Sequence, residues 1–201
     1  MNAPHGKSGD LVLVNNPAKW FTKSGIFSAL IRQKTGSDWS HVGTLLSWGD
    51  ASLLRVGLPE IKRRYVTLGN AGEFHVAEAM PSGYIVRPAS VYAGVPWRVR
   101  TWTEPLTTAE WKTGLACIGG FIGIPYDWPG LSGFVNRRST AGDNARLFCS
   151  EAAMFVAQAS GRLVGSELPA RLAPPSWFAG VPSPPIKTTA WQGIRPEGWI
   201  D

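Results

Sequence analysis

A cysteine and a histidine in this 201-residue chain could together break an acyl bond: Cys149 and His41. A cysteine attacks a carbonyl as its thiolate, and a neighbouring base must take up the proton and return it. In residues 150–160 the apolar residues recur at spacings of three and four, so we expect Cys149 at the amino terminus of a helix. There the helix dipole stabilises a thiolate, and unpaired N–H groups can bind an oxyanion. A cysteine in this position is more often a small core residue, so position alone does not decide its role.

The base must come from three histidines. His5 lies in a polar terminus, and His75 alternates away from the strand face that carries Glu78. His41 opens a strand-like run, where a side chain can face a cleft, and is the best candidate. Glu78 could hold its second ring nitrogen, as a base in a nucleophilic site requires. The alternative for Glu78 is an edge carboxylate paired with Arg87.

Alternating apolar runs and turn residues predict the elements that must position these side chains. The predicted strands are Leu11–Val14, His41–Leu46, Phe74–Ala79, Tyr84–Arg87 and Trp97–Trp102. A capping signature, Thr107 followed three residues later by Glu110, predicts a helix to Ile122, and a second helix covers 150–160. Residues 18–32 are expected to form a short amphipathic helix or a loop.

The length and composition predict one globular domain over residues 1–201, since 44% of the residues are hydrophobic and 17% charged. Residues 50–72 mix glycine, proline and basic residues without clear periodicity, so we expect an inserted hairpin or long loop there. Six prolines after residue 173 predict an extended, irregular segment over 174–201. Its aromatic residues suggest that this segment packs along the domain.

Five short motifs, taken in order along the chain, resemble the circularly permuted NlpC-type family of papain-like proteins, typified by YiiX/YebB-like members. The motifs are Gly9-Asp10-Leu11-Val12, Ser40-His41-Val42-Gly43, Val76-Ala77-Glu78-Ala79, Ile124-Pro125-Tyr126-Asp127 and Phe148-Cys149-Ser150-Glu151. The order, with histidine first, acid second and cysteine last, is the reverse of papain. The resemblance implies an α+β fold in which an antiparallel sheet or small barrel packs against helices.

The resemblance also assigns roles. It makes Cys149 the nucleophile, His41 the general base and acid, and Glu78 the residue that orients His41. The candidate substrate-binding residues in the same motifs are Tyr126, Ser40 and Ser150. Tyr126 could line the cleft or assist the oxyanion, or it could be a buried tyrosine with a satisfied hydroxyl.

Two further residues are given structural roles. Asp127 is interpreted as a turn or capping residue, and Cys117, inside the predicted helix, as part of the core. The interval from His41 to Glu78 is longer than in YiiX-like proteins because of the insertion at 50–72. That insertion could cover the cleft and shape specificity.

The implied activity is that of a cysteine peptidase or amidase, acting on a peptide or acyl substrate such as a cell-wall peptide. One alternative is an acyltransferase or lipid esterase of the lecithin-retinol type, although the Asn-Cys-Glu-His context of that branch is absent around Cys149. The other is an inactive module that binds cell-wall or virion components. No cofactor is expected, and no metal, because the chain lacks His-Glu-x-x-His and paired-cysteine spacings.

The formal net charge of +6 comes from short basic clusters, among them Lys62-Arg63-Arg64 and Arg137-Arg138. These lack the long basic runs of nucleic-acid-binding modules, so we expect no nucleic-acid partner and interpret the clusters as solvated surface. A dedicated site for an anionic partner is the alternative. The chain has no transmembrane-length apolar run, and Met1–Asp10 has no signal-peptide core, so it is expected to be cytoplasmic as encoded, with export or phage delivery left open. The oligomeric state is left open too.

Overall fold

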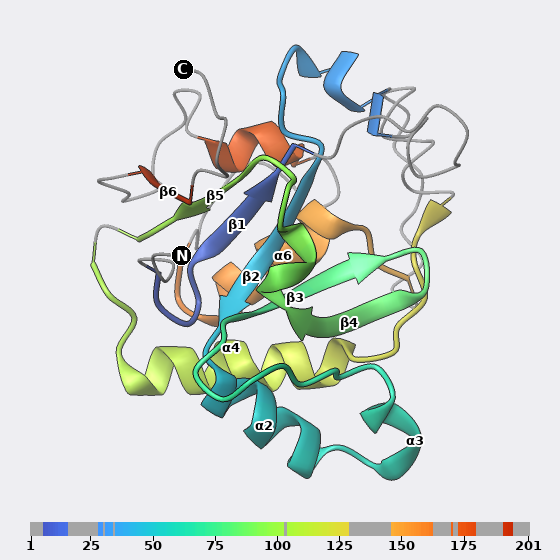
Figure 1. Ribbon diagram of the computed structural model, residues 1–201, viewed down its shortest axis with the longest axis vertical. Coiled ribbons are helices and arrows are strands. Elements are labelled where there is room, and N and C mark those ends of the chain that lie inside the picture. The colour runs from blue at the N-terminus through green and yellow to red at the C-terminus, as the bar shows by residue number, and fades with distance from the viewer. Residues whose placement is uncertain are drawn as a thin grey trace.

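The computed structural model describes residues 6–15, 28–29, 31–33, 35–102, 104–128, 146–162, 170, 173–179 and 191–194. The protein has an α+β fold in which a six-stranded sheet packs against helices (Figure 1). The strand order is β4-β3-β2-β1-β5-β6, and all neighbouring pairs are antiparallel. The predicted fold class is therefore confirmed, in the form of an antiparallel sheet.

The strands are short and lie close to their predicted positions. They are β1 (Leu11–Val14), β2 (His41–Leu46), β3 (His75–Met80), β4 (Gly83–Pro88), β5 (Trp97–Arg100) and β6 (Trp191–Ile194). β3 begins one residue after the predicted start, and β5 ends two residues before the predicted end. The alternation that predicted them is the pattern of a sheet with two different faces.

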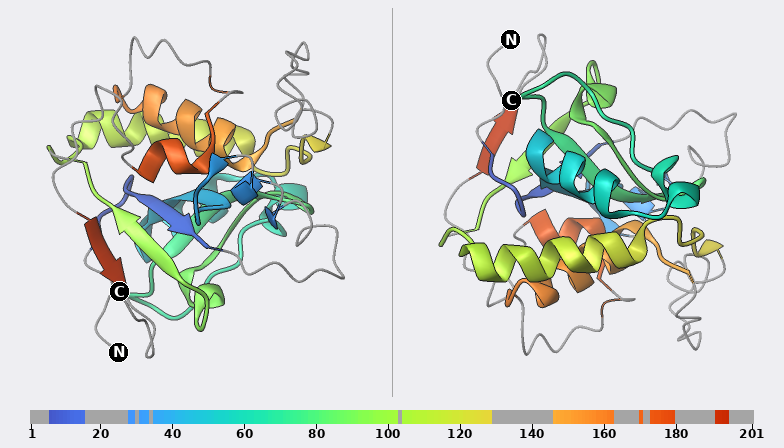
Figure 2. Two further views of the ribbon diagram at one scale, coloured as in Figure 1. Left: turned by 90° about the horizontal axis from the view of Figure 1, so that it is seen from above. Right: turned by 90° about the horizontal axis from the view of Figure 1, so that it is seen from below.

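Two long helices cover one face of the sheet, side by side, as Figure 2 shows. They are α4 (Thr108–Phe121) and α6 (Cys149–Ala159), and their inner residues meet Ala77, Tyr84 and Val86 of the sheet in one apolar cluster. The 3-10 helix η1 (Ala89–Tyr92) lies on the other face, in a cluster with Val12, Leu45 and Val76.

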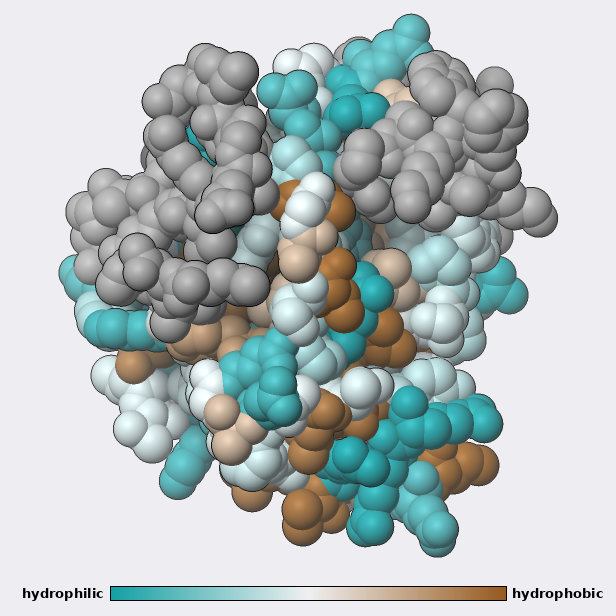
Figure 3. Space-filling view, in the orientation of Figure 1, coloured by the Kyte–Doolittle hydropathy of each residue, from teal (hydrophilic) through white to brown (hydrophobic). Residues whose placement is uncertain are grey.

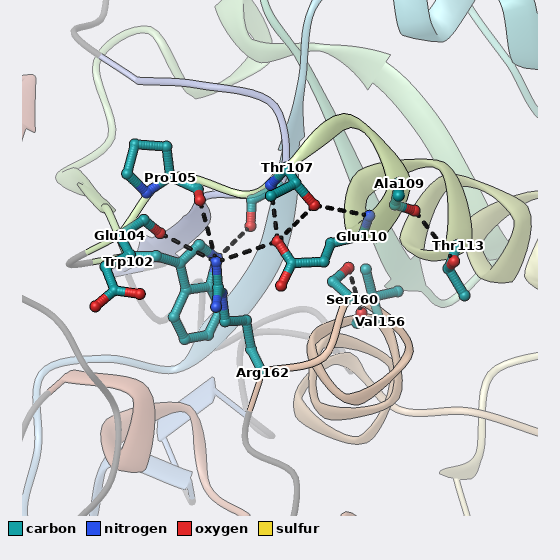
Figure 4. Close-up of polar contacts among 11 residues, drawn as sticks. Trp102, Glu104, Pro105, Thr107, Ala109, Glu110, Thr113, Val156, Ser160 and Arg162 are labelled. Atoms are coloured by element: carbon teal, nitrogen blue, oxygen red, sulfur yellow. Dashed lines mark hydrogen bonds and ion pairs between the residues drawn. The ribbon is translucent and has the colours of Figure 1, made fainter.

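The predicted capping box starts α4. The Thr107 hydroxyl accepts a hydrogen bond from the Glu110 backbone, and the Glu110 carboxylate accepts one from the Thr107 backbone at 2.7 Å. Arg162, which follows α6, donates to the carbonyls of Glu104 and Pro105 and lies 3.5 Å from Glu110 (Figure 4). These contacts tie the end of α6 to the start of α4, which fixes the relative position of the two helices.

The expectation of a hairpin or loop over 50–72 is wrong. The chain there forms α2 (Trp48–Gly57) and α3 (Glu60–Arg63). Ser47 caps α2 through the Asp50 backbone, and Ala51 and Leu54 are buried in the core. The helical spacing of these two residues was obscured by the exposed apolar residues Leu53 and Val56 on the same helix, which removed the contrast on which periodicity depends.

The C-terminal segment is also more regular than its prolines predict. Pro175–Ala179 forms the 3-10 helix η3, which packs against β1 and β2, and Trp191–Ile194 pairs with β5. The rest of 174–201 lies outside the described residues. Of the expected helix or loop over 18–32, only 28–29 and 31–32 are described, and they are helical. No helix among the described residues is long and apolar enough to cross a membrane.

Candidate active site

Cys149 is the first residue of α6 and is 3% exposed. The residue before it, Phe148, is the N-cap of α6, and its apolar side chain cannot accept a hydrogen bond from the helix. The first backbone amides of α6, which lie next to Cys149, therefore have no side-chain cap. Tyr126 forms a parallel bridge with Leu147, and the Asp127 amide donates to the Leu147 carbonyl at 3.0 Å. This bridge places the Pro-Tyr-Asp segment directly beside the thiol end of α6.

His41 and Glu78 lie on the two neighbouring strands β2 and β3. The β2–β3 register pairs Thr44 with Ala77, and one residue further along each strand puts Gly43 opposite Glu78. A Cβ atom at Gly43 would lie 3.2 Å from the Glu78 Cβ and 2.5 Å from a Val76 methyl carbon. Because Gly43 has no side chain, Glu78 can pack closely against β2, and its carboxylate can reach His41 on the same strand.

The Glu78 carboxylate is completely buried and joins three side chains. One oxygen lies 2.5 Å from His41 Nε2 and accepts a hydrogen bond from the Tyr92 hydroxyl. The other oxygen accepts a hydrogen bond from Arg87 Nε at 2.6 Å. The two predictions for Glu78, a partner of His41 and a partner of Arg87, are thus not alternatives, because the carboxylate makes both contacts.

The electrostatics of the site favour a protonated imidazole. Burial lowers the pKa of His41, but the Coulombic interaction and hydrogen bond with Cys149, together with those from Glu78, outweigh burial and raise it to about 10. Since Nε2 faces Glu78, Nδ1 is the nitrogen left for the Cys149 sulfur. Burial raises the pKa of Glu78, yet the contacts with His41, Arg87 and Tyr92 hold it below its ordinary value. The arrangement suits an imidazolium held against the buried Glu78 carboxylate.

A pocket opens beside His41. Six of the residues that line it are Ser40, His41, Met80, Arg87, Tyr92 and Tyr126. Burial, with the nearby Cys149 and Asp127, raises the pKa of the Tyr126 phenol well above its ordinary value, so this hydroxyl stays protonated. Of the three predicted substrate-binding residues, Tyr126 and Ser40 line the pocket, whereas Ser150 is 1% exposed in α6 and is not part of the described lining.

The other histidine and cysteine that the structure describes have separate environments. His75 is fully buried, where its Nε2 accepts from the Gly69 amide and its Nδ1 faces the Glu73 carbonyl, both at 3.0 Å. The sequence placed His75 on the strand face opposite Glu78, and the structure adds that this side chain is buried. Cys117 packs against the apolar cluster under α4, as predicted, and burial raises its pKa to about 11.

Sequence reasoning missed Tyr92. Its ring packs in the core on the η1 side of the sheet, its hydroxyl bonds to Glu78, and the Arg87 guanidinium lies over it at 5.3 Å. Arg87 Nη2 also donates to the Tyr92 hydroxyl at 3.3 Å. Nothing in a lone tyrosine after a predicted strand points to this contact, because the 3-10 turn that brings Tyr92 back to the sheet leaves no periodic signal.

The Gly43 position gives a direct test of how the acid is held. We expect Gly43→Ala to lower the free energy of unfolding by about 1–3 kcal/mol, because the new methyl group would overlap Val76 and press on Glu78. Urea denaturation measures this. The control is Gly57→Ala, where a Cβ would meet nothing within 4 Å. An equal, negligible effect at both glycines would contradict the close approach of Glu78 to Gly43.

The fold and site together define an α+β protein whose cysteine, histidine and acid meet at one end of an antiparallel sheet. The chain is similar in structure to the metalloprotein YiiX of Escherichia coli O157:H7, with a TM-score of 0.54 and 17% sequence identity over 96% of this chain and 98% of that one. This likeness shows a YiiX-like fold. No protein-family model matches the sequence, and no curated protein matches it.

If this chain held a metal ion, as the name of that metalloprotein neighbour suggests for the neighbour itself, the described residues should offer a set of ligands. Among them, no group of three or more histidine, cysteine, aspartate or glutamate side chains is arranged to hold a metal ion. His41 Nε2 and both Glu78 oxygens are already occupied by protein contacts. The described part of the chain does not fit a metal centre.

Proposed function

We propose that this protein is a thiol hydrolase that cleaves an amide bond, with peptides, and cell-wall peptides in particular, as the substrate class. The observation that carries the proposal is the continuous contact chain from Cys149 through His41 to Glu78 beside a pocket. A nucleophile in contact with a base, and a base held by a third group, is the arrangement that covalent acyl transfer requires.

In the proposed reaction the Cys149 thiolate attacks the amide carbonyl carbon and forms a C–S bond. The carbonyl oxygen becomes an oxyanion, which the first amides of α6 and the protonated Tyr126 hydroxyl would stabilise. The imidazolium of His41 gives its proton to the leaving amine as the C–N bond breaks. Neutral His41 then takes a proton from water, which attacks the thioester and releases a carboxylic acid and the thiolate.

The test is a substrate screen with matched variants. Wild type and Cys149→Ala are compared on cell-wall peptides, isopeptides and acyl esters, with Cys117→Ala as the control cysteine. We expect turnover by wild type and Cys117→Ala, and loss of turnover by at least about 1,000-fold in Cys149→Ala. Equal turnover by wild type and Cys149→Ala would reject the thiol mechanism. Turnover of lipid esters alone would move the assignment to the lipid-directed alternative.

A further inference from the structure

The helices α2 and α3 carry an unusual concentration of exposed apolar side chains. Five large hydrophobic residues are exposed among the described residues, and three of them lie here: Leu53 is 64% exposed, Val56 75% and Ile61 73%. Leu53 and Val56 are one turn apart on the outer side of α2, while Ala51 and Leu54 bury its inner side. α2 therefore shows apolar side chains both to the core and to solvent, which a surface helix without a partner does not need.

Four basic residues lie in the same stretch as these apolar side chains: Arg55, Lys62, Arg63 and Arg64. None of the four takes part in an ion pair with another described residue. The acidic residues of the same stretch are Glu60 and Asp50, and the Asp50 carboxylate is held by the Ser47 hydroxyl at 2.7 Å. The stretch therefore has an excess of uncompensated positive charge.

The apolar and basic side chains occupy one end of the molecule. α2 and α3 project from the lower end in Figure 1, and Figure 3 shows hydrophobic and hydrophilic side chains intermixed there. We name the seven side chains together the α2–α3 surface: Leu53, Arg55, Val56, Ile61, Lys62, Arg63 and Arg64. Its apolar members lie on two short helices, Leu53 and Val56 on α2 and Ile61 on α3.

We propose that the α2–α3 surface docks the protein on an anionic lipid bilayer. In such docking, apolar side chains insert between the lipid headgroups, and nearby lysine and arginine side chains are attracted to the anionic headgroups of the leaflet. Binding to a fluid surface needs no fixed shape complementarity, whereas a protein partner needs a packed apolar centre. Arg63 and Arg64 do make hydrogen bonds, to the Leu58 carbonyl and the Tyr65 hydroxyl, but neither bond neutralises their charge. Apolar side chains spread over two short helices, with cations that have no ion-pair partner among the described residues, therefore suit a bilayer better than an acidic protein.

The docking surface is distinct from the candidate active site. His41 is the first residue of β2, whereas α2 begins two residues after Leu46, the last residue of β2. The two sites thus lie at opposite ends of one strand. Docking through α2–α3 would use the end of the strand away from His41. None of the residues that line the pocket beside His41 belongs to 50–72, so the insertion is not part of the described lining.

The experiment measures sedimentation of the full chain with vesicles of phosphatidylcholine alone and of phosphatidylcholine mixed with phosphatidylglycerol. We expect binding to the anionic vesicles only, and weaker binding as salt rises, because salt screens the cationic residues. Arg55→Gln with Lys62→Gln should lower the partition coefficient about fivefold for each charge removed. The triple variant Leu53→Ser, Val56→Ser and Ile61→Ser should lower it at least about tenfold.

The matched control removes one exposed apolar and one exposed basic residue elsewhere, with Val91→Ser and Lys112→Gln, and should bind as wild type does. Urea denaturation checks that each variant folds. The proposal is overturned if wild type fails to bind anionic vesicles, binds neutral vesicles equally, or loses as much binding in the control as in the α2–α3 variants. The Cys149→Ala variant should bind anionic vesicles as wild type does. Failure of the docking proposal can therefore be told apart from failure of the proposed hydrolase activity.

Discussion

Iodoacetamide at pH 6.5 is expected to alkylate Cys149 at least about 100-fold faster than Cys117. The thiolate is the reactive species, and the imidazolium of His41, whose pKa is raised to about 10, keeps a positive charge beside the Cys149 sulfur at this pH. Cys117 has no such partner, and burial raises its pKa to about 11, so almost none of it is ionised. Mass spectrometry of the two cysteine peptides over time measures both rates in one sample.

The control for this experiment is His41→Ala, which removes the cation and leaves both cysteines in place. We expect the rate at Cys149 to fall toward that of an ordinary thiol, by about tenfold or more, while the rate at Cys117 stays the same. A wild-type rate at Cys149 that is unchanged in His41→Ala would show that the two side chains do not act together.

Replacing Glu78 with glutamine is expected to weaken both the fold and the proposed activity. The substitution keeps the shape but removes the negative charge from a fully buried position, which leaves Arg87 without its counter-ion. Breaking a buried ion pair by removing one partner costs several kcal/mol, and because the Arg87 side chain is 25% exposed we expect a loss of about 3 kcal/mol. The loss of turnover should reach about 100-fold to 10,000-fold, as His41 loses its orienting anion.

The pKa of His41 separates this effect from simple loss of stability. Glu78 is one of the two groups that raise this pKa, so in Glu78→Gln the imidazole should release its proton below the wild-type value of about 10. An NMR titration of the His41 ring measures the change in folded protein. The control is Glu60→Gln on the exposed α3 helix, which should leave stability and titration unchanged. A Glu78→Gln variant with wild-type titration would contradict the contact between Glu78 and His41.

The sheet was predictable because each strand has two different faces. Alternation in 41–46 and in 74–79 predicted which residues share a face within each strand, and the structure brings His41 Nε2 to 2.5 Å from a Glu78 oxygen. The capping box at Thr107 was predictable because it is a local pattern of four residues. The register between β2 and β3 could not be predicted, since it depends on side chains far apart in the chain.

The helices at 48–63 and the role of Tyr92 could not be predicted for two different reasons. In α2 the exposed Leu53 and Val56 removed the amphipathic contrast that would have indicated a helix. Tyr92 reaches Glu78 only because the chain turns back through η1 after β4, which is a tertiary contact without a local signature. The parts that escaped prediction are a helix with apolar side chains on its outer face and a contact between residues far apart in the chain.

The chain order of the three candidate catalytic residues affects when the site can form during synthesis. His41 and Glu78 lie in β2 and β3, whereas Cys149 begins α6, which packs onto strands that the ribosome has already released. A nascent chain can thus pair β1 to β4 and bury Glu78 before any thiol is near His41. Cys149 and His41 meet only when α6 docks, so, under the proposed mechanism, the growing polypeptide would not be exposed to an activated thiol while it is still unfolded.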